Sequence, residues 1–171
     1  MSPSPKSRTY REFYQKKQID PGNLESFSQK TKKSGKTLVT LNGSFDLLHA
    51  GHLEMIYQAS LQGDVLIVAL NSDSSIKQYK SADRPFIPLE QRMQMIAALD
   101  MVDYVTWFEE LDPRPLLSKL KPDVHVNGAE YGENCIEAET VKMNGGRLHI
   151  VELVPGLSTT QIVKRITSAC V

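Results

Sequence analysis

Two histidines, His49 and His52, follow an apolar stretch in the first third of the chain. They end the segment NGSFDLLHAGH at residues 42–52, in which Gly43 lets the backbone come close to a ligand and Gly51 removes a side chain between the imidazoles. We expect His52 to begin a helix, whose free amide groups and dipole favour an anion and tend to keep both imidazoles neutral. Two neutral histidines at a helix N-terminus can donate hydrogen bonds to phosphate oxygens. The segment therefore predicts a phosphate site.

A second anion-binding element is predicted near the end of the chain. Ser158 is suited to cap a helix, and Thr159 and Thr160 start the last predicted helix, so that hydroxyl and amide groups converge on one point. The triplet follows the fifth predicted strand, which places it at the same edge of the predicted sheet as the two histidines. This shared position favours one binding site made from both segments.

Both patterns have a simpler reading when they occur alone. In an isolated His-x-Gly-His pattern one histidine would more often pack in the core while the other caps a helix, and an isolated Ser-Thr-Thr triplet is usually only a cap. Here the histidines follow a predicted strand and a glycine turn and open a helix. That context favours the phosphate site.

Positive charge has to be gathered locally, because the chain is neutral overall. Its 171 residues include 20 Lys and Arg and 20 Asp and Glu, so no global field attracts nucleic acid or an anionic membrane. Lys77, Lys80, Arg84 and Arg92 follow the second predicted strand and are the candidate phosphate-binding cations. The alternative for the two lysines is a solvated helix face.

Other side chains have more than one possible role. Asp46 and Asp73 are predicted either to accept hydrogen bonds from substrate hydroxyls or to form turns. Cys135 and Cys170 lack metal-ligand spacing, and we expect them to be reduced rather than joined in a disulfide. Trp107 is expected in the core or at a dimer interface.

Five short apolar segments alternate with helical segments from residue 36 onward. Strands are predicted at 37–41, 64–70, 104–108, 123–126 and 148–153. Helices are predicted at 23–33, 53–61, 74–79, from Pro88 onward, and at 114–120, 137–143 and 159–168. The alternation predicts an α/β fold, a Rossmann-like doubly wound sheet of about five parallel strands in a single domain. Ligands of such sheets bind beyond the carboxyl ends of the strands, at the switch point.

The chain ends suggest a tail and a cytoplasmic location. Residues 1–22 are predicted to be an N-terminal tail or a loosely docked arm, and residues 23–171 the domain. Residues 1–17 are polar and lack the apolar region of a signal peptide. The longest apolar run, at residues 65–70, is too short to span a bilayer.

Several segments resemble a known superfamily. The segment at 42–52 resembles the signature of the cytidylyltransferase-like superfamily of nucleotidyltransferases, and GLSTTQI at 156–162 resembles its C-terminal Ser-Thr-Thr signature. NSDSSIKQYK at 71–80 and RPFIPLEQR at 84–92 are similar to the bacterial adenylyltransferase domain that makes ADP-heptose. The resemblance runs from about residue 35 to residue 166, in the family's order.

The resemblance implies transfer of AMP from ATP to a sugar 1-phosphate, with D-glycero-D-manno-heptose 1-phosphate as the leading acceptor, by a homodimer. It implies that magnesium arrives with the nucleotide, since no acidic cluster resembles a metal cage. The implied catalytic residues are His49, His52, Lys77 and Lys80. The implied nucleotide-binding residues are these histidines with Asn42, Gly43, Ser44, Phe45, Gly51, Arg92, Asn127, Gly128, Ser158, Thr159 and Thr160. The implied substrate-binding residues are Asp46, Asn71, Asp73 and Arg84.

Three places depart from the heptose enzymes. Ser44 stands where they usually have Cys, the segment KSA at 80–82 replaces a Lys-Gly turn, and NGAEY at 127–131 replaces Lys-Gly-Gly-Asp-Tyr. The last change removes a positive charge. Two alternatives therefore remain open. One is the same reaction with glycerol 3-phosphate or phosphoethanolamine and CTP, or with riboflavin phosphate and ATP. The other is a nucleotide-binding regulator without catalysis.

Overall fold

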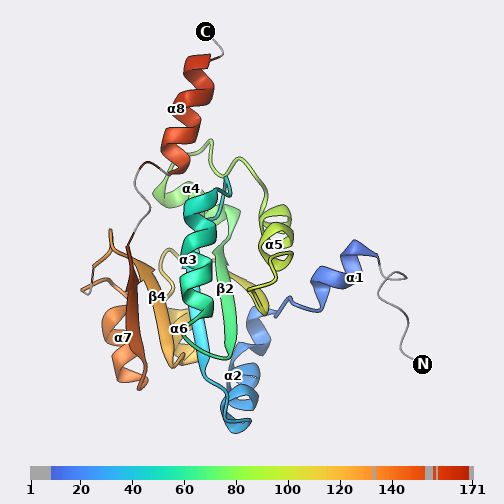
Figure 1. Cartoon of the computed structure of the whole chain (residues 1–171), viewed down its shortest axis with the longest axis vertical. Helices are drawn as coiled ribbons and strands as arrows, with labels where there is room; N and C mark the ends of the chain where they lie inside the picture. Colours follow the sequence, from blue (N-terminus) through green and yellow to red (C-terminus); the bar gives the residue numbers. More distant parts are fainter. Residues whose placement is uncertain (1–8, 133, 153–155, 157, 170–171) are drawn as a thin grey trace.

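A sheet of five parallel strands runs through the middle of the molecule (Figure 1). The structure is a computed structural model that describes residues 9–132, 134–152, 156 and 158–169. The strand order is β3-β2-β1-β4-β5. The strands are β1 (Leu38–Gly43), β2 (Val65–Asn71), β3 (Tyr104–Phe108), β4 (Val124–Gly128) and β5 (Arg147–Val151). Every neighbouring pair is parallel, which confirms the predicted doubly wound sheet.

Two strands are longer than predicted. The Asn-Gly pair after the first apolar stretch was expected to form a turn, yet Asn42 and Gly43 continue β1 and pair with Ala69 and Leu70 of β2. In the same way β4 extends to Gly128, which pairs with Val151. In each case ladder hydrogen bonds to one neighbouring strand, β2 for the end of β1 and β5 for the end of β4, outweigh the turn preference of this dipeptide. Both strand ends therefore reach the same edge of the sheet.

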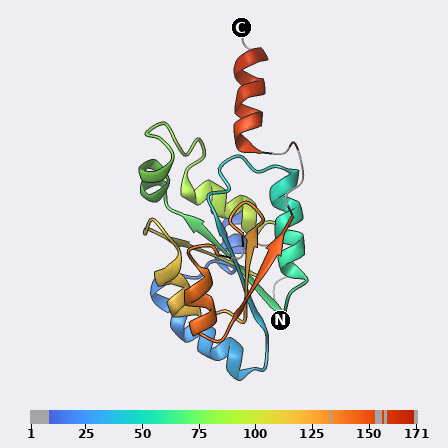
Figure 2. The ribbon, with the colours of Figure 1, turned by 90° about the vertical axis from the view of Figure 1, so that its left-hand side faces the viewer.

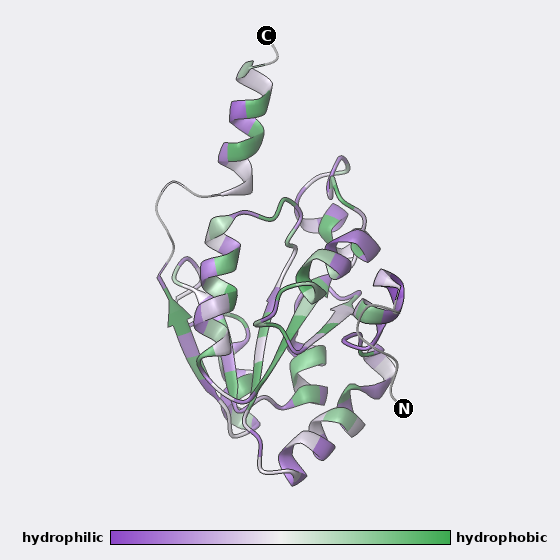
Figure 3. Cartoon of the chain, turned by 45° about the vertical axis from the view of Figure 1, so that its right-hand side comes forward, coloured by the Kyte–Doolittle hydropathy of each residue, from purple (hydrophilic) through white to green (hydrophobic). Residues whose placement is uncertain are grey.

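Helices cover both faces of the sheet (Figure 2). They are α1 (Tyr10–Gln15), the 3₁₀-helix η2 (Pro21–Asn23), α2 (Leu24–Lys33), α3 (Ala50–Ser60), α4 (Asp73–Tyr79), α5 (Leu89–Ala97), α6 (Arg114–Leu120), α7 (Ala138–Met143) and α8 (Thr159–Ala169). Buried residues of α3 and α5 pack in one core cluster against β1, β2 and β4. Buried residues of α2, α6 and α7 form a second cluster on the opposite face. Figure 3 shows hydrophobic residues gathered along the strands between these layers.

The described part of the predicted arm is docked on the sheet. Thr9 and Glu12 form a reciprocal capping box that starts α1. Beyond it the amide of Ile19 donates to the carbonyl of Val105 at 2.9 Å, and the amide of Val105 donates to the carbonyl of Lys17 at 2.8 Å. Ile19 is buried. These contacts line the outer edge of β3.

The last helix, α8, extends away from the body (Figures 1 and 2). None of its residues is buried. Its first turn nevertheless begins beside the sheet edge that carries the functional residues, as shown below. Among the described helices, none combines the length and the hydrophobicity that a membrane span requires.

Candidate active site

A cavity of about 280 Å³ opens at the carboxyl ends of β1 and β4. Because β1 lies between β2 and β4, this edge is the switch point of the sheet, where doubly wound folds bind ligands. Most of the predicted nucleotide-binding residues share this cavity. Its lining is Asn42, Gly43, Ser44, Phe45, His49, Gly51, His52, Met55, Lys80, Asn127, Gly128, Glu130, Tyr131, Ser158, Thr159 and Thr160.

The two histidines stack on each other at the start of α3. The helix begins at Ala50 rather than at His52, so that His49 is its N-cap, with φ −143° and ψ 168°. The imidazole centroids of His49 and His52 are 3.8 Å apart, with 22° between the ring planes. Phe45 lies against His52 at 5.2 Å between ring centroids. The segment after β1 thus holds both rings in one orientation at a helix N-terminus.

Burial keeps this histidine pair neutral. Removal from water lowers the pKa of His52 to about 4, helped by the neighbouring His49 and Lys80, and burial also lowers the pKa of His49. Each Nδ1 atom is buried without a hydrogen-bond partner in the described part of the chain. A neutral imidazole carries one donor nitrogen and one acceptor nitrogen. Each ring can therefore give one hydrogen bond to a phosphate oxygen near neutral pH.

Gly43 lines the cavity and also makes room for a neighbouring ring. A Cβ atom at this position would lie 3.0 Å from the Phe45 ring. Phe45 itself has a left-handed backbone, with φ 45°. Non-glycine residues rarely adopt this conformation, and such residues cluster at functional sites. The Phe45 ring in turn supports His52.

The structure separates the two candidate lysines. Lys80 caps the end of α4, lines the cavity, and donates from Nζ to Oγ of Ser44 at 2.9 Å. Burial lowers the pKa of Lys80, as do the nearby Arg84 and Arg92, while Asp46 opposes this shift. Lys77 lies on the exposed face of α4 and does not line the cavity. Only Lys80 is therefore placed to contact a ligand there.

Asp46 is occupied by the protein itself. Its carboxylate accepts a hydrogen bond from Nε of Arg84 at 2.6 Å and another from the amide of Ile87 at 2.9 Å. The residue is only 1% exposed. Asp46 thus ties the segment after β1 to the loop that precedes α5. Nη2 of Arg84 is buried and has no partner among the residues described, so it remains able to donate.

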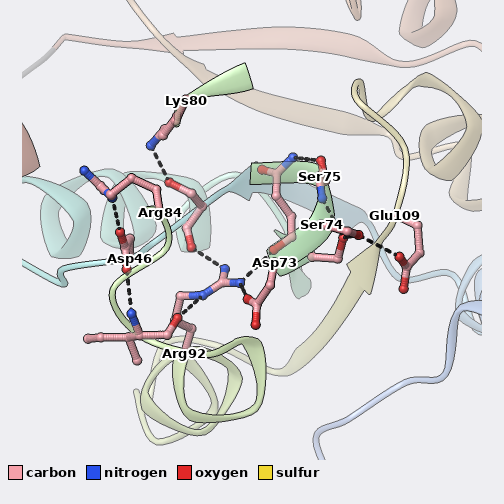
Figure 4. A network of polar contacts seen from close by, with 12 residues as sticks. Asp46, Asp73, Ser74, Ser75, Lys80, Arg84, Arg92 and Glu109 are labelled. Carbon is pink, nitrogen blue, oxygen red and sulfur yellow. Dashed lines mark hydrogen bonds and ion pairs between the residues drawn. The ribbon is translucent and has the colours of Figure 1, made fainter. Parts of the chain in front are cut away.

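Arg92 connects several segments of the chain through a network of hydrogen bonds (Figure 4). Its fully buried guanidinium donates to the carbonyls of Ser44, Asn71 and Ile87 at 2.6–3.0 Å. Nη2 also forms an ion pair with Asp73 at 2.6 Å. This geometry favours support of the site over the predicted contact of Arg92 with nucleotide. Asn71 and Asp73 likewise lie outside the cavity lining.

The C-terminal triplet reaches the cavity through the first turn of α8. Oγ of Ser158 accepts a hydrogen bond from the amide of Gln161 at 3.2 Å, as expected of a helix cap. Ser158, Thr159 and Thr160 all line the cavity. Asn127 and Gly128 complete the wall from the end of β4.

Three cavity residues were not predicted as site residues. Met55 stands one helical turn after His52 on α3, a spacing that places both on one face. Glu130 and Tyr131 follow β4, and the rule that ligands bind beyond strand ends would have pointed to them.

Cys135 is a free thiol, while Cys170 lies outside the described residues, so the expected reduced pair stays a prediction.

Removal of the Arg92 guanidinium should destabilise the fold. We expect Arg92→Met to lower the free energy of unfolding by about 3–5 kcal/mol, because three carbonyls lose their buried donor and Asp73 loses its partner. Urea unfolding measures the change. Arg114→Met is the matched control, since it removes an exposed arginine paired with Asp112 and should change stability little. Equal effects of the two substitutions would contradict the role of Arg92 as a support.

Comparison with known proteins agrees with this geometry. Residues 40–166 match the cytidylyltransferase-like family. The chain is 41% identical over 145 residues to the bifunctional protein HldE of Syntrophotalea carbinolica, covering 84% of this chain and 30% of that protein. It is 43% identical over 136 residues to the bifunctional protein HldE of Pelobacter propionicus, covering 79% and 28%. The chain thus spans less than a third of the length of these relatives.

Solved structures give the same picture. The lipopolysaccharide core biosynthesis protein of Thermoplasma volcanium superposes with a TM-score of 0.57 and 28% identity, covering 70% of this chain and 98% of that protein. Pantoate-β-alanine ligase of Francisella tularensis superposes with a TM-score of 0.62 over 90% of this chain and 78% of its own, and its 18% identity supports the fold alone. The family match covers most of the chain and includes both histidines and the Ser-Thr-Thr triplet. The chain belongs to the cytidylyltransferase-like family of nucleotidyltransferases.

Proposed function

We propose that this nucleotidyltransferase transfers AMP from ATP to a sugar 1-phosphate, with D-glycero-D-manno-heptose 1-phosphate as the leading acceptor, and releases pyrophosphate. The observation that carries the proposal is one cavity at the switch point that contains His49, His52, Lys80 and the Ser-Thr-Thr triplet. Support for the acceptor comes from the similarity of residues 71–92 to the domain that makes ADP-heptose. The likeness to a lipopolysaccharide core biosynthesis protein points in the same direction.

The proposed chemistry is a direct in-line displacement. A phosphate oxygen of the acceptor attacks the α-phosphorus of the nucleotide, and the bond from that phosphorus to the bridging oxygen of the β-phosphate breaks, so that pyrophosphate leaves. No covalent bond to the protein forms. Catalysis then consists of positioning the two substrates and stabilising charge on the phosphate oxygens.

Each group in the cavity has a part in that stabilisation. The neutral imidazoles of His49 and His52 donate to oxygens of the α-phosphate and of the leaving pyrophosphate. The ammonium of Lys80 balances negative charge on the phosphates, to which a chain without net charge contributes no general attraction. Ser158 and Thr159 place hydroxyl and amide groups at the N-terminus of α8, where an anion is favoured.

Magnesium is proposed to enter with the triphosphate. Within the described ranges no three His, Cys, Asp or Glu side chains come together as a metal site. We therefore propose an ion that is held mainly by phosphate oxygens and water, as Mg²⁺ commonly is. Bound in this way the ion would neutralise part of the phosphate charge. We further propose that the protein acts in the cytoplasm as a homodimer on small molecules, without nucleic acid or membrane partners.

Pyrophosphate release tests the substrates. We expect release to be faster with ATP than with CTP, and faster with a sugar 1-phosphate than with glycerol 3-phosphate, in a matrix of nucleoside triphosphates and phosphorylated acceptors. Heptose 1-phosphate, mannose 1-phosphate, phosphoethanolamine and riboflavin phosphate complete the acceptor set. Faster release with CTP and a polyol phosphate would identify the other acceptor class. No release from any pair would support a regulator.

The two lysines provide a matched pair of variants. We expect Lys80→Ala to lower kcat/KM for the nucleotide roughly ten- to a hundredfold, the range that one hydrogen bond to a charged group provides. Lys77→Ala removes the same charge three residues away on the exposed face of α4 and should leave kcat/KM unchanged. Steady-state kinetics measures both. A comparable loss in the two variants would mean that general charge, and not the position of Lys80, matters.

A further inference from the structure

One carboxylate lines the cavity in a position that a phosphate would avoid. Glu130 follows β4 and is the single acidic residue among the described residues that form the cavity wall. It is exposed and takes part in no ion pair within the described ranges. Like charges repel, and a cavity wall weakens the screening that water provides. The region of the cavity next to the Glu130 carboxylate is therefore suited to an uncharged group of a ligand.

The two carboxylates that the sequence predicted as hydroxyl acceptors are already engaged. Asp46 is held by Arg84 and by the amide of Ile87, and Asp73 is paired with the guanidinium of Arg92. Neither carboxylate lines the cavity. A nucleotide and a sugar phosphate both carry sugar hydroxyls, and these hydroxyls need acceptors when they leave water. Glu130 can supply that acceptor from within the described wall.

The charges in the cavity are arranged by strand. Lys80 enters from the segment after β2, whereas Glu130 and Tyr131 enter after β4, on the other side of β1. The carboxylate of Glu130 lies over Gly128, where any Cβ atom would collide with it. The pKa of Tyr131 is raised by burial and by the carboxylates of Glu130 and Glu137. The cavity thus has a cationic side toward β2 and an anionic side toward β4.

We infer that Glu130 is a specificity-determining residue that accepts hydrogen bonds from neighbouring hydroxyls of a substrate sugar ring. The inference rests on the proposed function, which brings phosphates to the histidine and Lys80 side. An ionised carboxylate has only acceptor sites, and two neighbouring hydroxyls can donate to its two oxygens. The hydroxyls belong either to the ribose of the nucleotide or to the sugar of the acceptor, and the two share this chemistry.

Calorimetric binding of paired ligands tests the inference without relying on turnover. The nucleotide arm compares ATP with 2′-deoxy-ATP and 3′-deoxy-ATP. The acceptor arm compares mannose 1-phosphate with 2-deoxyglucose 1-phosphate, which lacks only the 2-hydroxyl. Each arm is measured on the wild type, Glu130→Ala, Glu130→Gln and the control Glu25→Gln, an exposed residue of α2 on the opposite face of the sheet. Thermal unfolding verifies that all variants remain folded.

We expect the wild type and Glu25→Gln to favour the hydroxylated ligand roughly ten- to a hundredfold in one arm, and Glu130→Ala to lose that preference. Glu130→Gln should keep part of it, because the amide retains one acceptor oxygen. The arm that changes identifies the sugar. An unchanged preference in Glu130→Ala, or no preference or binding in the wild type, would overturn the inference. A further outcome separates the two proposals. If Glu130→Ala loses the hydroxyl selectivity while no pair of substrates releases pyrophosphate, the proposed function is rejected and the role of Glu130 in binding stands.

Discussion

The buried guanidinium of Arg92 is the contact on which the architecture of the site depends. It joins the loop after β1, through Ser44, to the end of β2, through Asn71, and to the loop before α5, through Ile87. A planar group with five donors can hold three carbonyls and a carboxylate at once, which a lysine could not do. Asp46 and Arg84 add a second tie between the same loops. Arg84 and Arg92 thus hold together the segments from which the histidines and Lys80 project.

The electrostatics of the cavity follow from the lack of net charge. A neutral chain cannot attract a triphosphate from a distance, so each positive or donating group has to be placed where a phosphate will lie. Burial holds the pKa of His52 near 4, which keeps the imidazole neutral over the physiological range. The donors are therefore available without adding charge that would repel Lys80. Glu130 on the far wall completes the separation of charge.

The strand pattern and the residues after the strands were enough to predict the sheet, the parallel direction of its strands and the edge at which the cavity lies. The histidines and the Ser-Thr-Thr triplet were predicted because a helix N-terminus after a strand has a definite place in this fold. The engaged states of Asp46 and Arg92 were not predictable, since all of their partners except Ile87 of Arg92 lie 19–48 residues away in sequence. Lys77 lies within α4, whereas Lys80 lies just after its end. Local propensity does not fix the last residue of a helix, so it could not tell which of the two lysines reaches the cavity. A docked arm was one of the two predicted alternatives for residues 1–22, but the hydrogen bonds of residues 17–19 to β3 were not predicted, because so short a segment has no periodic pattern.

The central claim is that the stacked histidines act on the phosphates of the bound nucleotide. Single-turnover pyrophosphate release by His49→Ala and His52→Ala, with ATP and the best acceptor of the wild type, tests it most directly. Loss of one preorganised donor should cost about 2.7–4 kcal/mol in the barrier, a roughly hundred- to thousandfold slower release, while circular dichroism shows an intact fold. Release at the wild-type rate in both variants would contradict the account.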